Sequence, residues 1–186
     1  MKLGTLDIVS VGEHLDLVAE PVREMLLSGA LSFDEIGVAS IDPSYSDTAT
    51  FCEHYHVEPD VCVNCVIVKA ERGDRQWYAA CAIPATMRAD VNGVVRRHLG
   101  ARRVSFASMD DALRETRMEY GGISQIGLPQ DWPLLIESTV ASLPKILIGA
   151  GVRSSKLILP GRLLKVLPNA ILLEHLGKKS VESKER

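Results

Sequence analysis

The segment Met118–Pro129, M-E-Y-G-G-I-S-Q-I-G-L-P, decides how the middle of this chain folds. Three glycines and a proline lie within its last nine residues, too many for a helix or a regular strand. We expect a shaped loop with exposed backbone amides and two polar side chains. Such a loop can hold an anion or a carbonyl oxygen, or its glycines can serve the geometry of a connector alone. The residues concerned are Gly121, Gly122, Ser124, Gln125 and Gly127.

Around this loop, short helices and strands follow one another without an internal repeat. Hydrophobic spacing predicts a helix over Leu15–Leu27, in which Pro21 marks either a kink or a late start. The clearest local prediction is a hairpin between the strands Val61–Lys69 and Gln76–Ile83. Further predicted strands cover 36–41, 104–106, 134–137, 146–148 and 156–159, and further predicted helices cover 47–55, 90–99, the residues after the capping pair Ser108 and Asp111, and 160–167. This order lacks the steady βαβ alternation of a doubly wound sheet, so the predicted fold class is α+β.

Composition fits one domain. The chain has 186 residues, of which 46% are hydrophobic and 24% are charged, which is enough to bury a sizeable core. Its first residues contain no long apolar stretch, so we expect no signal peptide, no membrane span and a cytoplasmic location. The final residues, Gly177–Arg186, are almost all polar and are expected to form a disordered tail.

The net charge of −3 argues against a general nucleic-acid coat, because phosphate binding needs a surplus of basic residues on some face. Two local concentrations of basic residues remain. They can be ordinary solvated surface, or they can steer the phosphates of a tRNA acceptor end. The first contains Arg88, Arg96, Arg97, His98, Arg102 and Arg103, and the second contains Lys145, Arg153, Lys156, Arg162 and Lys165.

The cysteines raise the question of a zinc site, because Cys62-x-x-Cys65 follows Cys52, His54 and His56. Val61–Lys69 reads as a strand, however, and side chains three apart on a strand point to opposite faces. Cys62 and Cys65 are therefore poorly placed to share one metal ion. We expect reduced, mostly buried thiols, which favours the cytoplasm again.

Several segments complete an ordered pattern with the glycine loop. They are the strand Cys62–Lys69 leading into Tyr78–Pro84, the basic segment Asp90–Val104, the strand Leu134–Ser138, and the turn Ile148-Gly149-Ala150-Gly151 followed by Arg153. From about Asp47 to about Leu167 this set resembles the YbaK/EbsC family of aminoacyl-tRNA deacylases, which includes the editing domain of bacterial prolyl-tRNA synthetases. The strongest pieces are G-G-I-S-x-x-G and x-G-A-G-x-R.

The resemblance implies a fold and a function. The fold is a curved mixed β-sheet approaching a barrel with helices packed around it, here a single domain over 1–176 with an N-terminal helix and strand extension over 1–45. The function is hydrolysis of a mischarged aminoacyl-tRNA, assisted by the substrate itself. The partners would be the aminoacylated tRNA acceptor end and a synthetase, and the reaction requires neither a metal nor an organic cofactor.

The resemblance also implies a site. We assign Asn64, Gly121, Gly122 and Ser124 to the catalytic set, and Gly127, Glu137, Gly149, Ala150, Gly151, Arg153 and Arg88 to substrate binding. Backbone amides of the glycine segments are the expected donors to the ester carbonyl, and losing one such donor typically costs about 3 kcal/mol of transition-state stabilisation. No side-chain base is evident, and Ser124 lacks the surroundings of a nucleophile. The pocket wall is drawn from Met87, Met118, Tyr120 and Ile126.

This sequence departs from the family at one important position. Members usually carry a lysine early in the strand where this chain has Asn64, which can form hydrogen bonds but carries no charge. Lys69 is five residues further on, so without a bulge it faces the opposite side of the sheet. Gln125 stands where proline is usual, and Glu137 where aspartate is common.

Two functions therefore remain open. The first is a freestanding editing hydrolase that removes a small amino acid from tRNA, specifically from tRNA(Pro). The second is a non-catalytic binding module for an aminoacyl-tRNA end, a nucleotide-like ligand or a synthetase. Asn64 favours the second, whereas the presence of both glycine segments favours the first.

Overall fold

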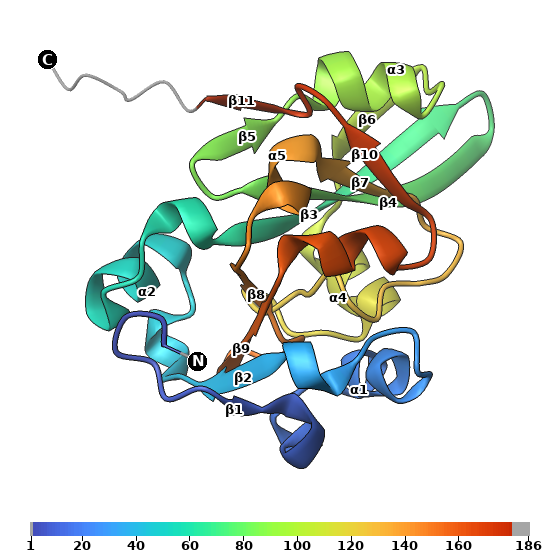
Figure 1. Cartoon of the computed structure of the whole chain (residues 1–186). Coiled ribbons are helices and arrows are strands. Elements are labelled where there is room, and N and C mark those ends of the chain that lie inside the picture. The colour runs from blue at the N-terminus through green and yellow to red at the C-terminus, as the bar shows by residue number, and fades with distance from the viewer. Residues whose placement is uncertain (1, 180–186) are drawn as a thin grey trace, which may run out of the picture.

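The computed structural model describes residues 2–179 and shows an α+β domain with strands in three sheets (Figure 1). The expected α+β class is confirmed. A four-stranded sheet has the order β1-β2-β9-β8, a five-stranded sheet has the order β10-β7-β4-β3-β6, and β11 pairs with β5. The sheets do not close into a barrel. A parallel bridge between Cys62 and Leu147 joins the start of β3 to β8.

The bounds of the elements are as follows. The strands are β1 (Val9–Ser10), β2 (Gly37–Ser40), β3 (Val63–Arg72), β4 (Arg75–Pro84), β5 (Met87–Ala89), β6 (Arg103–Phe106), β7 (Leu134–Glu137), β8 (Ile146–Gly149), β9 (Ser155–Leu159), β10 (Ala170–Leu173) and β11 (Gly177–Lys179). The α-helices are α1 (Glu20–Leu27), α2 (Thr48–Tyr55), α3 (Arg96–His98), α4 (Met109–Thr116) and α5 (Ser138–Ser142). The 3-10 turns are η1 (Val11–Glu13), η2 (Leu15–Leu17), η3 (Phe33–Glu35), η4 (Pro43–Tyr45), η5 (Pro59–Val61) and η7 (Gly161–Val166), and η6 (Val91–Val95) is a π-helical turn.

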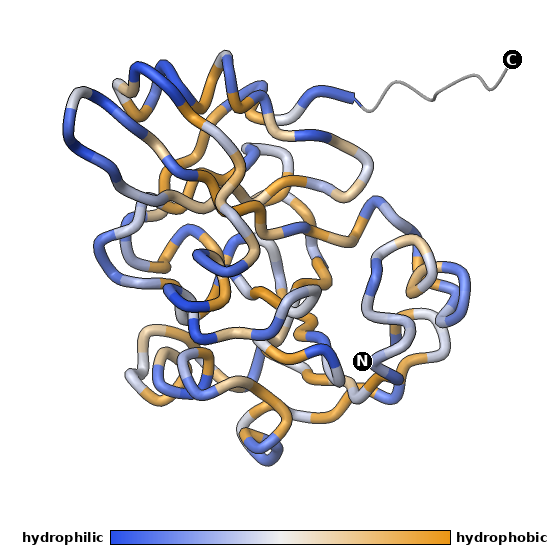
Figure 2. The backbone as a smooth tube through the Cα atoms, turned by 180° about the vertical axis from the view of Figure 1, so that it is seen from behind, coloured by the Kyte–Doolittle hydropathy of each residue, from blue (hydrophilic) through white to orange (hydrophobic). Residues whose placement is uncertain are grey.

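Alternation along the strands distributes apolar side chains to both faces of each sheet. Ile146 and Ile148 of β8 belong to the main core between the two larger sheets, whereas Leu147 faces the cluster under α2. In β7, Ile136 faces the main core and Leu135 faces the cluster beneath η6 and α3. Strands β7 and β8 are therefore covered on both faces, which explains why they read as unbroken apolar runs. Figure 2 shows hydrophobic stretches through the interior and a hydrophilic tip on the β3–β4 hairpin.

The predicted hairpin is confirmed, and its strands extend closer to the turn than expected. β3 and β4 pair without interruption from Val63 opposite Pro84 to Arg72 opposite Arg75. No bulge intervenes, so Lys69 lies on the sheet face opposite to Asn64, as expected.

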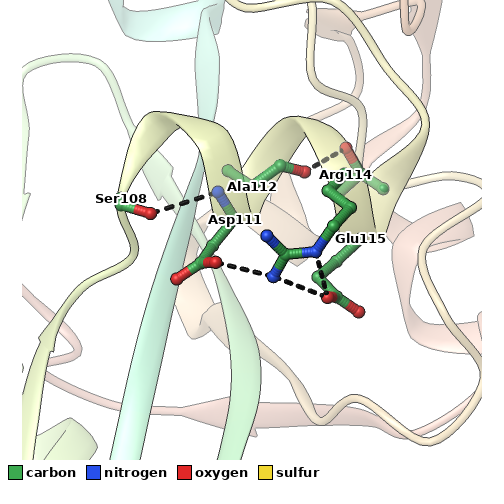
Figure 3. Close-up of polar contacts among 6 residues, drawn as sticks. Ser108, Asp111, Ala112, Arg114 and Glu115 are labelled. Atoms are coloured by element: carbon green, nitrogen blue, oxygen red, sulfur yellow. Dashed lines mark hydrogen bonds and ion pairs between the residues drawn. The ribbon is translucent and has the colours of Figure 1, made fainter.

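Local capping signals also predicted helix starts correctly. The Asp47 carboxylate accepts hydrogen bonds from the amides of Ala49 and Thr50 at the start of α2. The Ser108 hydroxyl accepts from the Asp111 amide at 3.1 Å, as Figure 3 shows for α4. Each bond satisfies an amide that has no partner within its own helix.

Other boundaries differ from the predictions. Pro21 lies in the first turn of α1, so it marks a late start, and the preceding residues form η2. The segment after Pro160 is a 3-10 turn, and the helix after Asp90 begins as a π-helical turn. Gly177–Lys179 pairs with β5 and is not part of a disordered tail, while the remainder of the predicted tail, 180–186, lies outside the described residues.

The N-terminal segment is integrated into the fold. β2 pairs with β9 in the same sheet as β8, so the expected extension over 1–45 supplies two strands to a sheet shared with the rest of the chain. Within residues 2–179, no helix has both the length and the apolar character that crossing a membrane requires.

Candidate active site

A cavity of about 400 Å³ lies where the two larger sheets meet. Its walls come from the start of α2, the first residues of β3, the glycine loop, the end of β8 and the start of β9. Its volume falls within the roughly 300–1,000 Å³ range of small-molecule sites. The lining residues are Ser46, Asp47, Thr48, Phe51, Cys62, Val63, Asn64, Cys65, Val66, Tyr120, Gly121, Ile123, Leu147, Ile148, Gly149, Arg153 and Lys156.

Asn64 lies half-buried on the β3 wall of this cavity. Its Oδ1 accepts a hydrogen bond of 3.2 Å from the Thr48 hydroxyl at the start of α2. This bond fixes the plane of the amide. Because an asparagine amide carries two N–H donors, the Nδ2 group remains for a ligand oxygen.

The glycine loop forms another wall of the cavity, and its amides fall into two groups. The Gly122 amide donates to Glu119 O at 3.0 Å, and the Gly151 amide donates to Gly122 O at 2.7 Å. Both donors are therefore already used. Within the described residues, the amides of Gly121 and Ile123 have no protein acceptor, and both residues line the cavity. These two amides are the donors available to a carbonyl oxygen.

Close packing explains the glycine pairs. A Cβ atom on Gly149 would lie 2.3 Å from Gly122 O, and one on Gly122 would lie 2.4 Å from Val152 O. Neither position has room for a side chain. At Gly121, by contrast, the nearest atom to an added Cβ is Ser46 Oγ at 3.4 Å. The glycine loop and the β8–β9 turn are thus held together by backbone contact.

Gln125, which stands where the family usually has proline, fixes the loop to β3. Its Nε2 donates to Val63 O at 3.2 Å, next to Asn64 in the chain. The side chain is buried, and its Oε1 has no hydrogen-bond partner in the part of the chain that the structure describes. This contact holds the loop wall and the strand wall of the cavity in register.

Two cations reach the cavity, Arg153 from the turn between β8 and β9 and Lys156 from the start of β9. Arg153 is exposed at the rim, where its amide donates to Glu119 Oε2 at 2.7 Å and its Nη2 donates to Pro43 O at 3.1 Å. Lys156 lies deeper, with 7% of its surface exposed. Both residues belong to the second concentration of basic residues in the sequence, but only Arg153 was assigned to the site. The available signal was a lysine inside the otherwise apolar strand Ser155–Leu159.

A family model for the aminoacyl-tRNA editing domain matches residues 42–166, more than half of the chain. The chain belongs to this family. The match agrees closely with the expected extent of the resemblance, from about Asp47 to about Leu167, and it contains every residue that lines the cavity. No curated protein sequence matches the chain.

Solved structures share the fold of this editing domain. A candidate trans-editing enzyme for prolyl tRNA synthetase superposes with a TM-score of 0.69 at 17% identity, covering 88% of this chain and 99% of the other. The protein APE2540 superposes with a TM-score of 0.73 at 19% identity, covering 86% and 100%. At these identities the likeness establishes the fold.

Within this editing domain, the eleven assigned site residues separate into three groups. Four of them line the cavity: Asn64, Gly121, Gly149 and Arg153. Four lie behind its walls: Gly122, Ser124, Ala150 and Gly151. Ser124 is fully buried, and its hydroxyl accepts from the Ile126 amide at 3.1 Å, which stabilises the loop from within.

The remaining three residues lie elsewhere. Gly127 packs against α1, where an added Cβ would lie 2.5 Å from Pro21. Glu137 is buried at the end of β7, and its Oε2 accepts from the Gly177 amide at 2.9 Å, which anchors β11. Arg88 is exposed on β5 opposite Lys178. None of these three residues lines the cavity. Gly127 and Glu137 hold other parts of the fold together, and Arg88 lies on the surface.

The candidate wall residues and the histidines are also sorted by the editing-domain structure. Of the four wall candidates, Tyr120 lines the cavity, Met118 and Ile126 belong to the main core, and Met87 lies on β5 opposite Lys179. No histidine is among the lining residues of the described chain, and His54 stacks on Tyr45 at a ring distance of 3.8 Å. The cavity therefore offers hydrogen-bond donors and cations rather than an imidazole base.

The cysteines occupy separate environments in this domain. Cys62 lies 3.6 Å from Cys52, sulfur to sulfur, in the cluster under α2. Cys65 packs against the main core, and its thiol donates to Ser124 O at 3.7 Å. The two ends of the C-x-x-C motif therefore face different clusters, as its strand position predicted. Burial raises the pKa of the Cys62 and Cys65 thiols, so neither is a thiolate at neutral pH.

Proposed function

We propose that this protein hydrolyses the ester bond of a mischarged aminoacyl-tRNA, acting in trans on tRNA(Pro) that carries a small amino acid. The observation that supports this most is the pair of amides at Gly121 and Ile123 without an acceptor among the described residues, because both residues line, together with Asn64, a cavity within the family's editing domain. Aminoacyl-tRNA is a cytoplasmic substrate, so the cytoplasm is the proposed place of action.

In this mechanism the two loop amides donate to the ester carbonyl oxygen. The Asn64 amide orients either the attacking water or the free hydroxyl of the terminal ribose. Water adds to the carbonyl carbon, and negative charge develops on the oxygen beside the amides. The bond to the ribose oxygen then breaks, and the proton lost by the water passes to that oxygen through the neighbouring ribose hydroxyl. The products are the free amino acid and the tRNA.

Substrate assistance fits the composition of the cavity wall. Among the lining residues of the described chain, Asp47 is the sole carboxylate, and its Oδ1 already accepts two amides of α2. The thiols remain protonated, as described above. The ribose hydroxyl is thus the group best placed to carry the proton.

The tRNA body requires a second contact, for which we propose a groove at the far end of β3. It is lined by Arg72, Arg96, Arg97 and Arg102 together with small residues, and none of the residues 2–179 that line it is acidic. Arg72 lies eight positions after Asn64 on β3, which is roughly 26 Å along the strand. A groove of this charge suits the phosphate backbone of the tRNA.

The alternative function is a binding module, and Asn64 is the observation that favours it, because an amide supplies no charge to the reaction. Such a module would retain the cavity and bind an aminoacylated end or a synthetase without releasing amino acid.

Amino-acid release from Ala-, Cys-, Ser- and Thr-tRNA(Pro) tests both functions. We expect turnover by the native protein and a reduction of about 10- to 100-fold in Asn64→Ala, since one positioned hydrogen-bond donor is lost. Asn92→Ala, at an exposed position, is the matched control and should retain native turnover. Gly122→Val is unsuitable, because its side chain would collide with Val152.

Absence of turnover on every substrate, with tRNA or synthetase binding retained, would move the protein to the binding-module class. Turnover that is equal in native protein and Asn64→Ala would leave the hydrolase but remove Asn64 from its site.

A further inference from the structure

The Lys156 side chain is a buried cation whose hydrogen-bonding capacity is mostly unused. An ammonium has three N–H donors. One of them bonds to Ser46 O at 3.2 Å, and the Nζ atom lies 5.7 Å from the centroid of the Phe51 ring. No carboxylate of the described residues lies within 4.0 Å of Nζ. Two donors therefore remain for a group that enters the cavity, which Lys156 lines.

The titratable neighbours do not neutralise this charge by direct contact. Desolvation raises the pKa of the Cys52 and Cys62 thiols, so both are uncharged at neutral pH. Asp47 is the nearest acid, and its Oδ1 is engaged with α2. Arg153 adds a second positive charge at the rim. Desolvation lowers the pKa of Lys156 itself, as expected for an ammonium taken out of water without a counterion.

Burying a cation in this way is costly for folding, so its position in a cavity points to a ligand. A ligand oxygen that carries or develops negative charge would satisfy the free donors. The two cations lie at different depths in the cavity, so each suits a different oxygen of the ligand. Arg153 is exposed, which suits a phosphate at the mouth, whereas Lys156 is 7% exposed, which suits the group inserted furthest.

We propose that Lys156 is a catalytic residue whose ammonium binds the carbonyl oxygen of the aminoacyl ester and stabilises the oxyanion formed there. This inference rests on the hydrolytic function proposed above. It places the cation on β9, in the same cavity that the uncharged Asn64 of β3 lines.

The step is balanced without any additional reactant. The water oxygen bonds to the carbonyl carbon, and the carbonyl electron pair moves to the oxygen beside Lys156. When the carbonyl reforms, the bond to the ribose oxygen breaks. The ribose oxygen takes the proton released by the water, and Lys156 remains an ammonium throughout.

The test compares Lys156→Met, which keeps the length of the side chain and removes its charge, with Lys165→Met at an exposed position. Single-turnover deacylation is measured on the mischarged tRNA(Pro) that the native protein cleaves fastest. We expect the rate constant of Lys156→Met to fall about 100-fold or more, with KM within about threefold, as for the loss of an oxyanion donor. Lys165→Met should match the native protein, and thermal unfolding should show that both variants are folded.

A second variant returns a positive charge to the cavity from strand β3. Asn64→Lys combined with Lys156→Met returns an ammonium to the same cavity, and we expect it to recover at least about tenfold in rate over Lys156→Met alone. A rate for Lys156→Met within about threefold of native would overturn the proposal. A raised KM with an unchanged rate constant would also overturn it, because it would assign Lys156 to ground-state binding.

The role of Lys156 can be tested even if the native protein does not hydrolyse aminoacyl-tRNA. If the native protein releases no amino acid, calorimetry with a non-hydrolysable amide analogue of alanyl-adenosine replaces the rate measurement. An affinity at least about tenfold weaker in Lys156→Met than in Lys165→Met would keep the Lys156 contact to the carbonyl oxygen as ground-state binding in a binding module and would overturn its catalytic role. Equal affinities would reject the contact.

Discussion

The two ends of strand β3 contrast in how they use positive charge. At the Asn64 end, Lys156 is enclosed with one acceptor, and glycines of two loops touch backbone to backbone. At the Arg72 end, four arginines line an open groove in which their guanidinium groups stay solvated. In the sequence the two concentrations of basic residues look alike. They differ in burial. A desolvated cation can stabilise charge that develops during the reaction, whereas a solvated cluster attracts the tRNA during diffusional association.

Glycine substitution should show the largest difference between the two ends. An alanine Cβ at Gly149 would lie 2.3 Å from Gly122 O, whereas at Gly73, in the hairpin turn, it would meet no atom within 4 Å. We expect Gly149→Ala to lower the free energy of unfolding by about 3 kcal/mol through overpacking. Gly73→Ala should cost about 1 kcal/mol, because φ there is +60°. Urea unfolding measures both, and equal losses would contradict close packing at the cavity.

At the cavity end, removing the charge of Lys156 should raise the free energy of unfolding while it lowers the rate of deacylation. Lys156→Met relieves the desolvation of an ammonium, so we expect a gain of about 1–2 kcal/mol in the free energy of unfolding. Arg97→Met at the exposed end should stay within about 0.5 kcal/mol of native. Thermal and urea unfolding provide the measurement. A large loss of stability in Lys156→Met would indicate that the lysine serves folding rather than the ligand.

The pH dependence of that gain follows from the direction of the pKa shift. Burial lowers the pKa of Lys156 in the folded protein below its usual 10.5. Between the folded and unfolded values the unfolded chain binds more protons, so the native protein gains stability relative to Lys156→Met as the pH rises. The stability difference should be largest at neutral pH and should narrow as the pH rises toward 10.5. Cys52 and Cys62 titrate in both proteins, so the difference rather than either curve is the readout. A constant difference would contradict a desolvated ammonium.

Local signals made parts of this fold predictable from the sequence. The hairpin, the Asp47 cap and the Ser108 cap each depend on residues within a few positions, so their patterns were sufficient. β10 and β11 were missed because their partners, β7 and β5, lie far away in the chain. Neither strand has a strong alternation of its own.

The site was predictable only in outline. The sequence identified the glycine loop, but it could not show that the Gly122 amide is used internally while those of Gly121 and Ile123 are free. That division depends on the contact between two distant loops. Lys156 was missed for a similar reason, because the burial of one lysine in a basic run depends on α2 covering its strand.

The smallest effects are expected at the arginine groove. We expect Arg96→Gln, Arg97→Gln and Arg102→Gln each to raise KM for aminoacyl-tRNA about threefold at low salt and to leave the rate constant unchanged, because each removes a phosphate contact remote from the ester. Each should also reduce the slope of log affinity against log salt by about 1. Lys165→Met, outside both regions, is the control. Filter binding at several salt concentrations distinguishes the outcomes: an unchanged slope in all three variants would leave the groove as ordinary solvated surface, and a reduced rate constant would mean that the two ends of β3 are not separate in function.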